Sequence, residues 1–470
     1  MNKNIRVIIC IFVVIFTMMG LYFCNYLLFK KDDYISSAHN KRLSSYSEHV
    51  VRGSILSSDG EKLAETVVDE FGEEKRIYPY NNLFAHSVGH VEKGYTGIEA
   101  LGNFYMVSSH ESIFKKIADD VSGKKRTGDN IVTTLNVRLQ QAAYDALGDY
   151  RGACVVLEPD TGRILAMVSK PDFNPNTIEQ DWEAINSIQG NDCLLNKATR
   201  GVYAPGSTFK VMTTLEYLRE HPDNYQSYLY NCTGENNIMQ DYSVHCYGGL
   251  VHGVLDLEHS LAQSCNCSFS NIGISLNKER FSGLCSDFLF NKTIPGSYGC
   301  VKSQFVLSAD DSDAVTAQTA IGQGKTTISP MHNALIAATI ANGGVMMTPY
   351  VIDRVENYKG KTVVDFEPKM YDKLMSADEA ACIKDMMKLV VSEGTGARLI
   401  SESYQAAAKT GSAQFSSDVD DTHAWILAFA PADAPKIAIS VIVERGGSGG
   451  ETAAPIAKRI LDVYFDETSD

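Results

Sequence analysis

The sequence has no excess of basic residues: it contains 42 Lys and Arg against 57 Asp and Glu, and its formal net charge is −15. Binding to nucleic acid needs clustered positive charge against the phosphates, so this balance argues against a nucleic-acid partner. The sequence also has no internal repeats and no low-complexity tracts, and its 44% of hydrophobic residues is ordinary for a globular protein. A chain of 470 residues is long enough for two folded units and an appendage.

Beyond residue 29 the sequence has no second long run of uncharged apolar residues. The first run extends from Val7 to Phe29, and as a helix it would span roughly 35 Å, enough to cross a bilayer. No small-residue cleavage site of the signal-peptide type follows it. We therefore expect residues 1–30 to hold one uncleaved transmembrane signal-anchor, with the rest of the chain on one side of the cell membrane.

Standard metal-binding spacings are also missing, although the chain contains eleven cysteines. Nine lie beyond the anchor, and an odd number cannot pair completely within one chain. The pairs Cys232 and Cys246, or Cys285 and Cys300, are spaced plausibly for local disulfides, while the alternative is that most are small buried apolar residues. A group of Cys232, His245, Cys246 and His252 matches no standard zinc spacing, so we expect no metal site.

The chain changes character near residue 130. Residues 30–49 are polar and are typical of a stalk, whereas residues 51–130 are rich in turns. The segment "VRGSILSSDGEKLAE" predicts a strand, a turn at Asp59-Gly60 and a second short element. We interpret this region as a small non-catalytic module.

The remainder begins with the helical pattern "TTLNVRLQQAAYDAL" and continues with "GACVVLEPDTGRILAMVS", which predicts a β-hairpin. A second pair of strands is predicted near the end by "HAWILAFAP" and "KIAISVIVERGG", while residues 200–345 are interpreted as mostly helical. Strands at both ends with helices between them indicate one antiparallel sheet built from distant segments and packed with helices, which is an α+β fold.

Three short motifs carry the candidate chemistry. In the first, "YAPGSTFKVMTTLEYL", Ser207 and Lys210 are three residues apart at the start of an apolar helix and share one face. A desolvated lysine can take the proton of a serine hydroxyl, and a helix N-terminus favours developing negative charge. The alternative is an ordinary helix start with a lysine that extends its amine to the solvent.

The second and third motifs are weak when taken singly. In "LAQSCNCSFSNIG", Ser264 and Asn266 could both project from a turn into one cleft, although capping of a turn or helix is the competing interpretation. In "AAAKTGSAQF", Lys409 followed by Thr410 and Gly411 suggests a strand that closely approaches a ligand, with an edge strand protected by a lysine as the alternative.

In the order Ser-x-x-Lys, Ser-x-Asn and Lys-Thr-Gly, the three motifs together match the set found in the serine enzymes that react with penicillin. The chain therefore resembles a class B penicillin-binding protein, a monofunctional peptidoglycan D,D-transpeptidase, and most of all the compact penicillin-binding protein A type. The segments "VRGSILSSDG", "GYTGIE", "AIGQGKTTISPMHNA" and "DTHAWILAFAP" extend the resemblance over essentially everything after the anchor.

The resemblance implies that Ser207 attacks the carbonyl between the last two residues of a D-Ala-D-Ala stem peptide and forms an acyl-enzyme. Lys210 would accept the serine proton, and Ser264 would relay a proton to the leaving amine. Asn266 would orient Lys210, and Lys409 would support Ser264 electrostatically. The neighbouring strand residues would bind the substrate; these are Thr410, Gly411 and Ser412. The backbone N–H groups of Ser207 and Ser412 would form the oxyanion hole.

The resemblance also implies a transpeptidase domain of the serine β-lactamase type, with an antiparallel sheet, flanking helices and a helical subdomain, at residues 131–470. A stalk and a non-catalytic pedestal domain would occupy residues 31–130, and the catalytic domain would be extracytoplasmic. The implied partners are peptidoglycan stem peptides, β-lactams as covalent inhibitors, the membrane through the N-terminal helix, and a membrane-embedded glycosyltransferase. No cofactor, no metal and no nucleic acid are implied.

Several alternatives are weighed against this interpretation. A phosphate-binding loop at "GQGKTT" is rejected because Thr319 stands where the pattern needs a glycine. His423 is expected to be structural, because Lys210 already supplies a base, and "RGGSGG" is expected to be a loop that closes the sheet. A serine β-lactamase or β-lactam sensor, and a non-catalytic scaffold of the cell-wall machinery, stay open as alternative functions.

Overall fold

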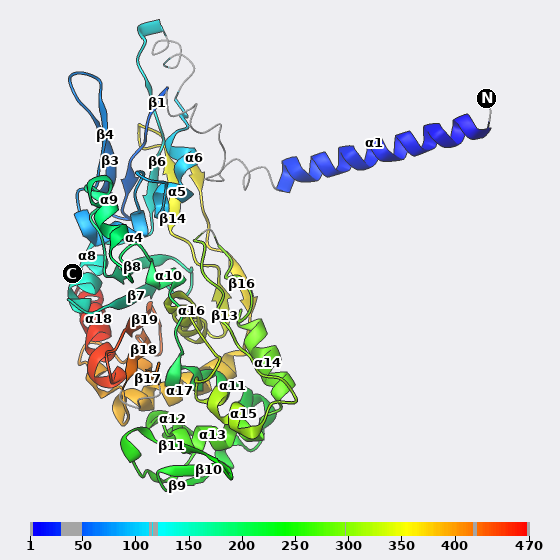
Figure 1. The fold of residues 1–470 in the computed structure, drawn as a ribbon, viewed down its shortest axis with the longest axis vertical. Helices are drawn as coiled ribbons and strands as arrows, with labels where there is room; N and C mark the ends of the chain where they lie inside the picture. The colour runs from blue at the N-terminus through cyan, green and yellow to red at the C-terminus, as the bar shows by residue number, and fades with distance from the viewer. Residues whose placement is uncertain are drawn as a thin grey trace.

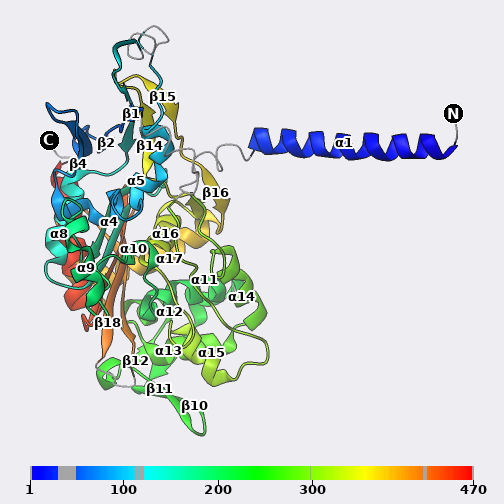
Figure 2. The same cartoon turned by 45° about the horizontal axis from the view of Figure 1, so that its top comes forward.

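The structure is a computed structural model of the chain, and it describes residues 3–29, 49–111, 115, 121–296, 298–416 and 421–467. Of the predicted stalk at residues 30–49, only residue 49 lies within the described part. Figures 1 and 2 show an elongated body, with the N-terminal strands at one end and a mainly helical region at the other.

Helix α1 (Lys3–Phe29) contains the segment predicted to be an anchor. Among the described residues it is the one helix that is long and apolar enough to cross a membrane, and none of its span from Asn4 to Asn25 is buried against the rest of the chain. By length and composition, it fits the expected signal-anchor.

A five-stranded antiparallel sheet forms the centre of the large unit, in the strand order β17-β18-β19-β7-β8. The predicted hairpin provides β7 and β8, and the two predicted strands near the C-terminal end provide β18 and β19, so both predictions are confirmed. The bounds are β7 (Gly152–Leu157), β8 (Ile164–Lys170), β17 (Ala407–Gln414), β18 (Thr422–Ala430) and β19 (Ile437–Val443).

Both faces of this sheet are covered by helices, which explains why its central strands β18, β19 and β7 are largely apolar. On β18, Ala424 and Ile426 face one core with helices α8 (Val137–Leu147) and α18 (Ala454–Glu467). The alternate residues Trp425 and Leu427 face the second core, where helix α16 (Pro330–Ala341) packs. The helix predicted from "TTLNVRLQQAAYDAL" is therefore confirmed as α8, and α16 lies in the range 200–345 interpreted as mostly helical; both helices pack on the sheet.

The N-terminal unit is built on a six-stranded sheet in the order β15-β14-β6-β2-β3-β4. Two of its strands, β14 (Ile352–Glu356) and β15 (Thr362–Asp365), come from within the range 131–470 expected for the other domain, so this sheet crosses the expected boundary at residue 130. The remaining bounds are β2 (Ile55–Leu56), β3 (Lys62–Val68), β4 (Glu74–Ile77) and β6 (Asn130–Thr133).

A buried ion cluster holds this N-terminal unit together. Glu99 is fully buried, and its carboxylate accepts hydrogen bonds at 2.7 Å from both Arg52 and Arg76. Burial alone would raise the pKa of Glu99, but the two guanidinium groups outweigh it and hold that pKa below its ordinary value. The cluster links three segments, because Arg52 precedes β2, Arg76 lies in β4 and Glu99 lies in α5 (Gly97–Leu101).

The middle of the large unit contains helices, as predicted, but residues 230–255 form two small two-stranded sheets instead. The pairs are β9 with β12 and β10 with β11. The prediction of a mostly helical segment is wrong at this point, because the segment's glycines and β-branched residues favour hairpins. The four strands are β9 (Tyr230–Cys232), β10 (Glu235–Met239), β11 (Tyr242–His245) and β12 (Gly253–Leu255).

The other helices of the middle region are α11 (Lys210–Glu220), α12 (Leu257–Ala262), α13 (Asn266–Ser275), α14 (Lys278–Asp287), α15 (Asp313–Ala320) and α17 (Ala377–Ser392). The remaining strands are β1 (Val50–Val51), β5 (Arg126–Thr127), β13 (Val345–Met347) and β16 (Met370–Lys373), and the remaining α-helices are α4 (Ala85–Val88), α6 (Asn103–Met106), α9 (Ile178–Ser187) and α10 (Lys197–Arg200).

Candidate active site

Ser207 lies in a short 3-10 turn, η2 (Gly206–Phe209), that leads directly into α11. The turn needs a glycine before the serine, because Gly206 has a φ of +54° and a Cβ there would approach the Ser412 carbonyl oxygen to 2.9 Å. The backbone N–H of Gly206 donates to the carbonyl of Gly322 at 2.9 Å. These contacts hold the half-buried Ser207 hydroxyl at the start of a helix, beside β17.

Lys210 does not extend to the solvent: it is fully buried, so the snorkelling alternative is wrong. Its Nζ donates to the Ser264 carbonyl and to Asn266 Oδ1, each at 2.7 Å. Burial lowers the pKa of Lys210 to about 8, against a smaller opposing effect of the nearby cysteine thiols. An amine with this pKa is partly neutral near pH 7 and can accept a proton.

Ser264 and Asn266 occupy the sharp turn between α12 and α13. Ser264 has a φ of +55°, a strained conformation for a residue other than glycine, and its Oγ accepts a hydrogen bond from Lys409 Nζ at 2.9 Å. Asn266 starts α13 and donates through Nδ2 to the carbonyl of His245. The turn therefore brings both predicted polar groups to the two buried lysines.

Strand β17 supplies Lys409 and the three residues after it. Lys409 is fully buried, so the alternative of a protective lysine on an exposed edge is wrong. Burial lowers the pKa of Lys409 well below its ordinary value, and the neighbouring Lys210 lowers it further. Gly411 allows close approach of the serine turn, because a Cβ there would lie 3.1 Å from the Thr208 side chain.

A cleft of about 730 Å³ opens over these groups. The predicted residues among its lining are Ser207, Ser264, Asn266, Thr410, Gly411 and Ser412, and the two lysines lie beneath it. The structure therefore brings all eight predicted side chains or backbone positions to one place. Lys210 directs its hydrogen bonds to Ser264 and Asn266, and among the described contacts none joins it to Ser207.

Several residues that shape this cleft were not predicted from the sequence. The Thr395 hydroxyl bonds to that of Thr410, and Gly322 packs so tightly on the serine turn that a Cβ would lie 2.1 Å from the Gly206 carbonyl oxygen. Gly449 donates through its N–H to Ser412 Oγ at 3.3 Å. Gly322 lies in the segment "GQGKTT" and Gly449 in "RGGSGG". Both segments stand out in the sequence, but neither pattern indicates that its glycine packs against the distant Ser207 turn or strand β17.

Replacing Gly449 with alanine is expected to slow acylation by a penicillin about 100-fold. The added Cβ would lie 2.3 Å from the Trp425 carbonyl oxygen and 2.4 Å from that of Gly411, so β17 must move. A displacement of about 1 Å in a catalytic group costs on the order of 100-fold in rate. Gly283→Ala is the matched control, because its Cβ would meet nothing within 4 Å. Equal acylation rates for the two variants, measured by stopped-flow fluorescence, would contradict the prediction.

The cysteines form no disulfides: all eleven are free, although Cys232 and Cys246 lie close together. Neither of the two local disulfides that the spacing allows, Cys232–Cys246 and Cys285–Cys300, is therefore present, and most of the cysteines are buried, as the alternative interpretation has it. Cys232, Cys246, His252 and Cys265 form a group whose ligand atoms could hold a metal ion. His423 accepts a hydrogen bond from the Arg445 backbone and stacks on Phe415, in accordance with a structural role.

Two family descriptions match the chain. "Penicillin binding protein transpeptidase domain" matches residues 152–462, and "Penicillin binding protein A dimerisation domain" matches residues 52–131. The first covers the five-stranded sheet and the cleft, and the second covers most of the N-terminal strands.

Similar proteins and solved structures agree with these two family matches. The chain is 32% identical to a peptidoglycan D,D-transpeptidase PbpA of Mycolicibacterium smegmatis, and 31% identical to that of Mycobacterium tuberculosis, over 94% and 93% of both chains respectively. Among solved structures, penicillin-binding protein A of M. tuberculosis as a penicillin G acyl-enzyme complex has a TM-score of 0.80 and 29% identity, and the match covers 88% of this chain and 99% of that one. Its ceftriaxone acyl-enzyme complex has a TM-score of 0.81 at 29% identity, over 90% and 99% of the two chains.

Proposed function

Since the chain belongs to the family of penicillin-binding protein transpeptidases, we propose that Ser207 is its acylated nucleophile and Lys210 the base that activates it. The chain is a serine D,D-transpeptidase that cross-links peptidoglycan and is inhibited covalently by β-lactams. The observation that supports the residue assignment is the position of Lys210, which is buried, has a lowered pKa and follows Ser207 by one helical turn.

In the first half of the reaction, Ser207 Oγ attacks the carbonyl carbon of the penultimate D-Ala of a stem peptide. Its proton passes to Lys210, and the backbone N–H groups of Ser207 and Ser412 stabilise the oxyanion, with roughly 3–4 kcal/mol from each donor. The peptide C–N bond then breaks. Ser264, which accepts a hydrogen bond from Lys409, passes its proton to the leaving amine of D-Ala. Lys210, whose Nζ also donates to Ser264 Oγ at 3.4 Å, replaces that proton with the one it took from Ser207.

In the second half, the amine of a neighbouring stem peptide attacks the ester carbon of the acyl-enzyme. A new amide bond forms, the ester bond breaks and Ser207 regains its proton. Asn266 keeps Lys210 oriented in both halves. Thr410 and Ser412 act in the first half, where they bind the terminal carboxylate of the donor before D-Ala leaves, with Gly411 giving the substrate room beside β17. An ester shielded from water and open to an amine gives cross-linking rather than hydrolysis.

The location of the chain follows from the same premise. Residues 1–30 anchor it as a single transmembrane helix, residues 31–130 form the stalk and pedestal, and residues 131–470 form the catalytic domain, with β14 and β15 added to the pedestal sheet. The catalytic domain faces the extracytoplasmic side, where the stem peptides lie. A membrane-embedded glycosyltransferase is the partner that supplies glycan strands to such an enzyme.

The assignment is tested by intact-mass spectrometry of the full chain in detergent after brief incubation with a penicillin. We expect one adduct of the drug's mass that persists for hours and maps to the Ser207 peptide. An adduct lost within seconds would indicate a β-lactamase instead. Folded protein without any adduct would leave only the scaffold function.

A further inference from the structure

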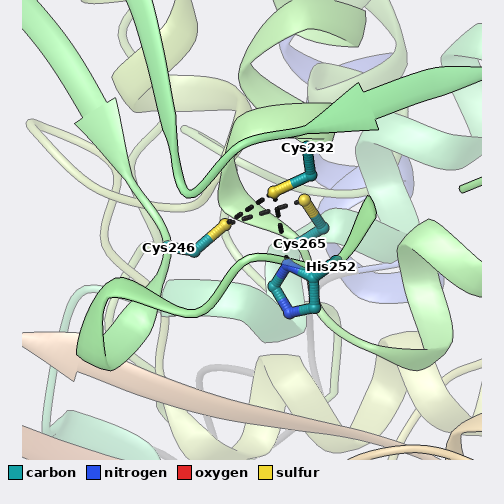
Figure 3. A group of neighbouring side chains, drawn as sticks. All are labelled: Cys232, Cys246, His252 and Cys265. Carbon is teal, nitrogen blue, oxygen red and sulfur yellow. Dashed lines mark hydrogen bonds between the residues drawn. The ribbon is translucent and has the colours of Figure 1, made fainter. Parts of the chain in front are cut away.

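A compact group of metal-ligand side chains lies in the wall of the active-site cleft. The Sγ atoms of Cys232, Cys246 and Cys265 and the Nδ1 atom of His252 all lie within 4.8 Å of one another, and the three cysteines are buried. Figure 3 shows the three sulfur atoms and the imidazole pointing toward one another from separate segments. Cys246 and His252 also line the cleft itself.

Three distances within the group match the edges of a zinc tetrahedron, and the remaining pairs of ligand atoms lie within 4.8 Å. Bonds of about 2.3 Å to sulfur and about 2.0–2.1 Å to nitrogen place two sulfur ligands about 3.8 Å apart and a sulfur and a nitrogen about 3.5 Å apart. The observed separations are 3.7 Å from Cys246 Sγ to both Cys232 Sγ and Cys265 Sγ, and 3.4 Å from Cys232 Sγ to His252 Nδ1. A disulfide would instead require about 2.05 Å.

We propose that Cys232, Cys246, His252 and Cys265 bind one structural zinc ion. Three thiolates and one neutral imidazole complete a tetrahedron, so no position is left for water, as in structural rather than catalytic zinc sites. Binding releases three thiol protons to the solvent and leaves a centre of net charge −1. Cys267, whose Sγ lies 3.4 Å from Cys246 Sγ, donates to the Val244 carbonyl and stays outside the ligand set.

The region around these residues lacks the core that would otherwise hold it. Two-stranded sheets are marginally stable alone, and the pairs β9–β12 and β10–β11 share a buried cluster of only four cysteines and one leucine among the described residues. Apolar side chains of the same segment are instead exposed; these are Met239, Tyr247, Leu250, Val251 and Val254. Small units with so little buried area are usually held by a disulfide or a metal, and no disulfide is present here.

The chain preorganises each ligand. Cys232 and His252 lie side by side because Cys232 pairs with Gly253 across the β9–β12 ladder. Cys265 is the N-cap of α13, where its sulfur accepts the Ser268 N–H at 3.3 Å, and a helix N-terminus favours a thiolate. Cys246 directly follows β11 and donates its N–H to the Gly234 carbonyl.

The site has a direct link to the catalytic turn. Cys265 stands between Ser264 and Asn266, so a zinc ion bound to it would fix both neighbours. Lys210 and Lys409 are buried, and the hydrogen bonds they donate go to neutral oxygens. A centre with a net negative charge beside them would offset the cost of burying these two amines.

The proposal is tested by the metal content of the full chain, purified in detergent under reducing conditions without chelators. We expect about one zinc ion per wild-type chain. In Cys265→Ser, which lacks one ligand, the zinc content should fall about tenfold or more. Cys300→Ser, a cysteine outside the group, should keep the full content. Wild-type protein without zinc, or full zinc content in Cys265→Ser, would overturn the proposal. A disulfide among the three cysteines, found in peptides from a separate preparation purified without reductant, would also overturn it.

A second measurement on the wild-type chain avoids any folding defect of a variant. After zinc is removed with a chelator, added cobalt(II) should give the charge-transfer band of thiolate ligands and the intense visible bands of tetrahedral geometry. Cys232, Cys246 and Cys265 should react with a thiol reagent only in the chelated state. A cobalt spectrum without thiolate bands, or labelling that is the same with and without zinc, would overturn the site. Neither measurement uses a β-lactam, so both are independent of the catalytic assignment.

Discussion

Replacing Ser207 with alanine is expected to abolish acylation by penicillin and the cross-linking of stem peptides, with a rate loss of about 10⁴-fold or more. In the proposed mechanism the alcohol oxygen of Ser207 forms the ester, and the other hydroxyl of the serine turn, that of Thr208, is buried and donates to the Pro205 carbonyl. Because Ser207 is only half-buried, its loss should change stability by less than about 0.5 kcal/mol. Intact-mass spectrometry and analysis of cross-linked products measure the two activities.

A matched control for this variant is Ser187→Ala, an exposed serine of α9, which should keep both activities. Binding to partner proteins should also survive in Ser207→Ala, which separates a catalytic role from that of a scaffold. An adduct of normal mass and rate on the alanine variant would show that another residue is the nucleophile.

Replacing Lys210 with methionine is expected to slow acylation about 10²–10⁴-fold, the usual contribution of a general base. The pKa of Lys210 is lowered to about 8, so in the wild type the neutral fraction, and with it the acylation rate, should rise about tenfold per pH unit below 8 and level off above it. In Lys210→Met this dependence should disappear. Rates of acylation between pH 6 and pH 10 provide the measurement.

Lys210→Arg separates proton transfer from positive charge at the same position. A guanidinium keeps the charge but cannot give up its proton near neutral pH. We therefore expect the arginine variant to be as slow as the methionine variant. Substantial acylation by the arginine variant would mean that Lys210 acts through its charge, and that the base is elsewhere.

The residues proposed as catalytic could be selected from the sequence because the first motif combines chemistry with a local structural signal. The Pro-Gly turn before Ser207 and the apolar helix after Lys210 are visible in a short window, and the structure bears out both. The motifs that contain Ser264, Asn266 and Lys409 are each too weak to indicate a functional site alone. Their order along the chain after the Ser207 motif is what identifies them as one set. Local sequence thus carried the identity of these residues, while their convergence is a property of the fold.

The cysteine group could not be predicted, because its members come from four places that only the fold brings together. Known zinc spacings place ligands in tight pairs, whereas Cys232, Cys246, His252 and Cys265 occur singly along the chain. The group of possible ligands visible in the sequence contained His245, which is exposed, in place of Cys265. Interpreting residues 200–345 as mostly helical concealed the β9–β12 ladder, which sets Cys232 beside His252.

The strand pairing in the sheet of the N-terminal unit is a second feature that local sequence could not predict. The first strands of this sheet were predicted from residues 51–65, but nothing local in residues 352–365 indicates that β14 should pair with β6, more than two hundred residues earlier. Such pairing depends on which edge is open once the rest has folded. A linear division of the chain therefore could not place these two strands in the N-terminal unit.

The five-stranded sheet also determines how the chain must be made. Ribosomes add about 5–20 residues per second, so β7 and β8 are complete roughly 15–55 s before residue 443, the end of the strand that pairs with β7. During that interval the apolar hairpin has an unpaired edge, which invites pairing with other chains. A chaperone that binds extended apolar segments would be needed most within this window. The order of synthesis, rather than the stability of the finished sheet, therefore determines when a newly synthesised chain is most prone to aggregation.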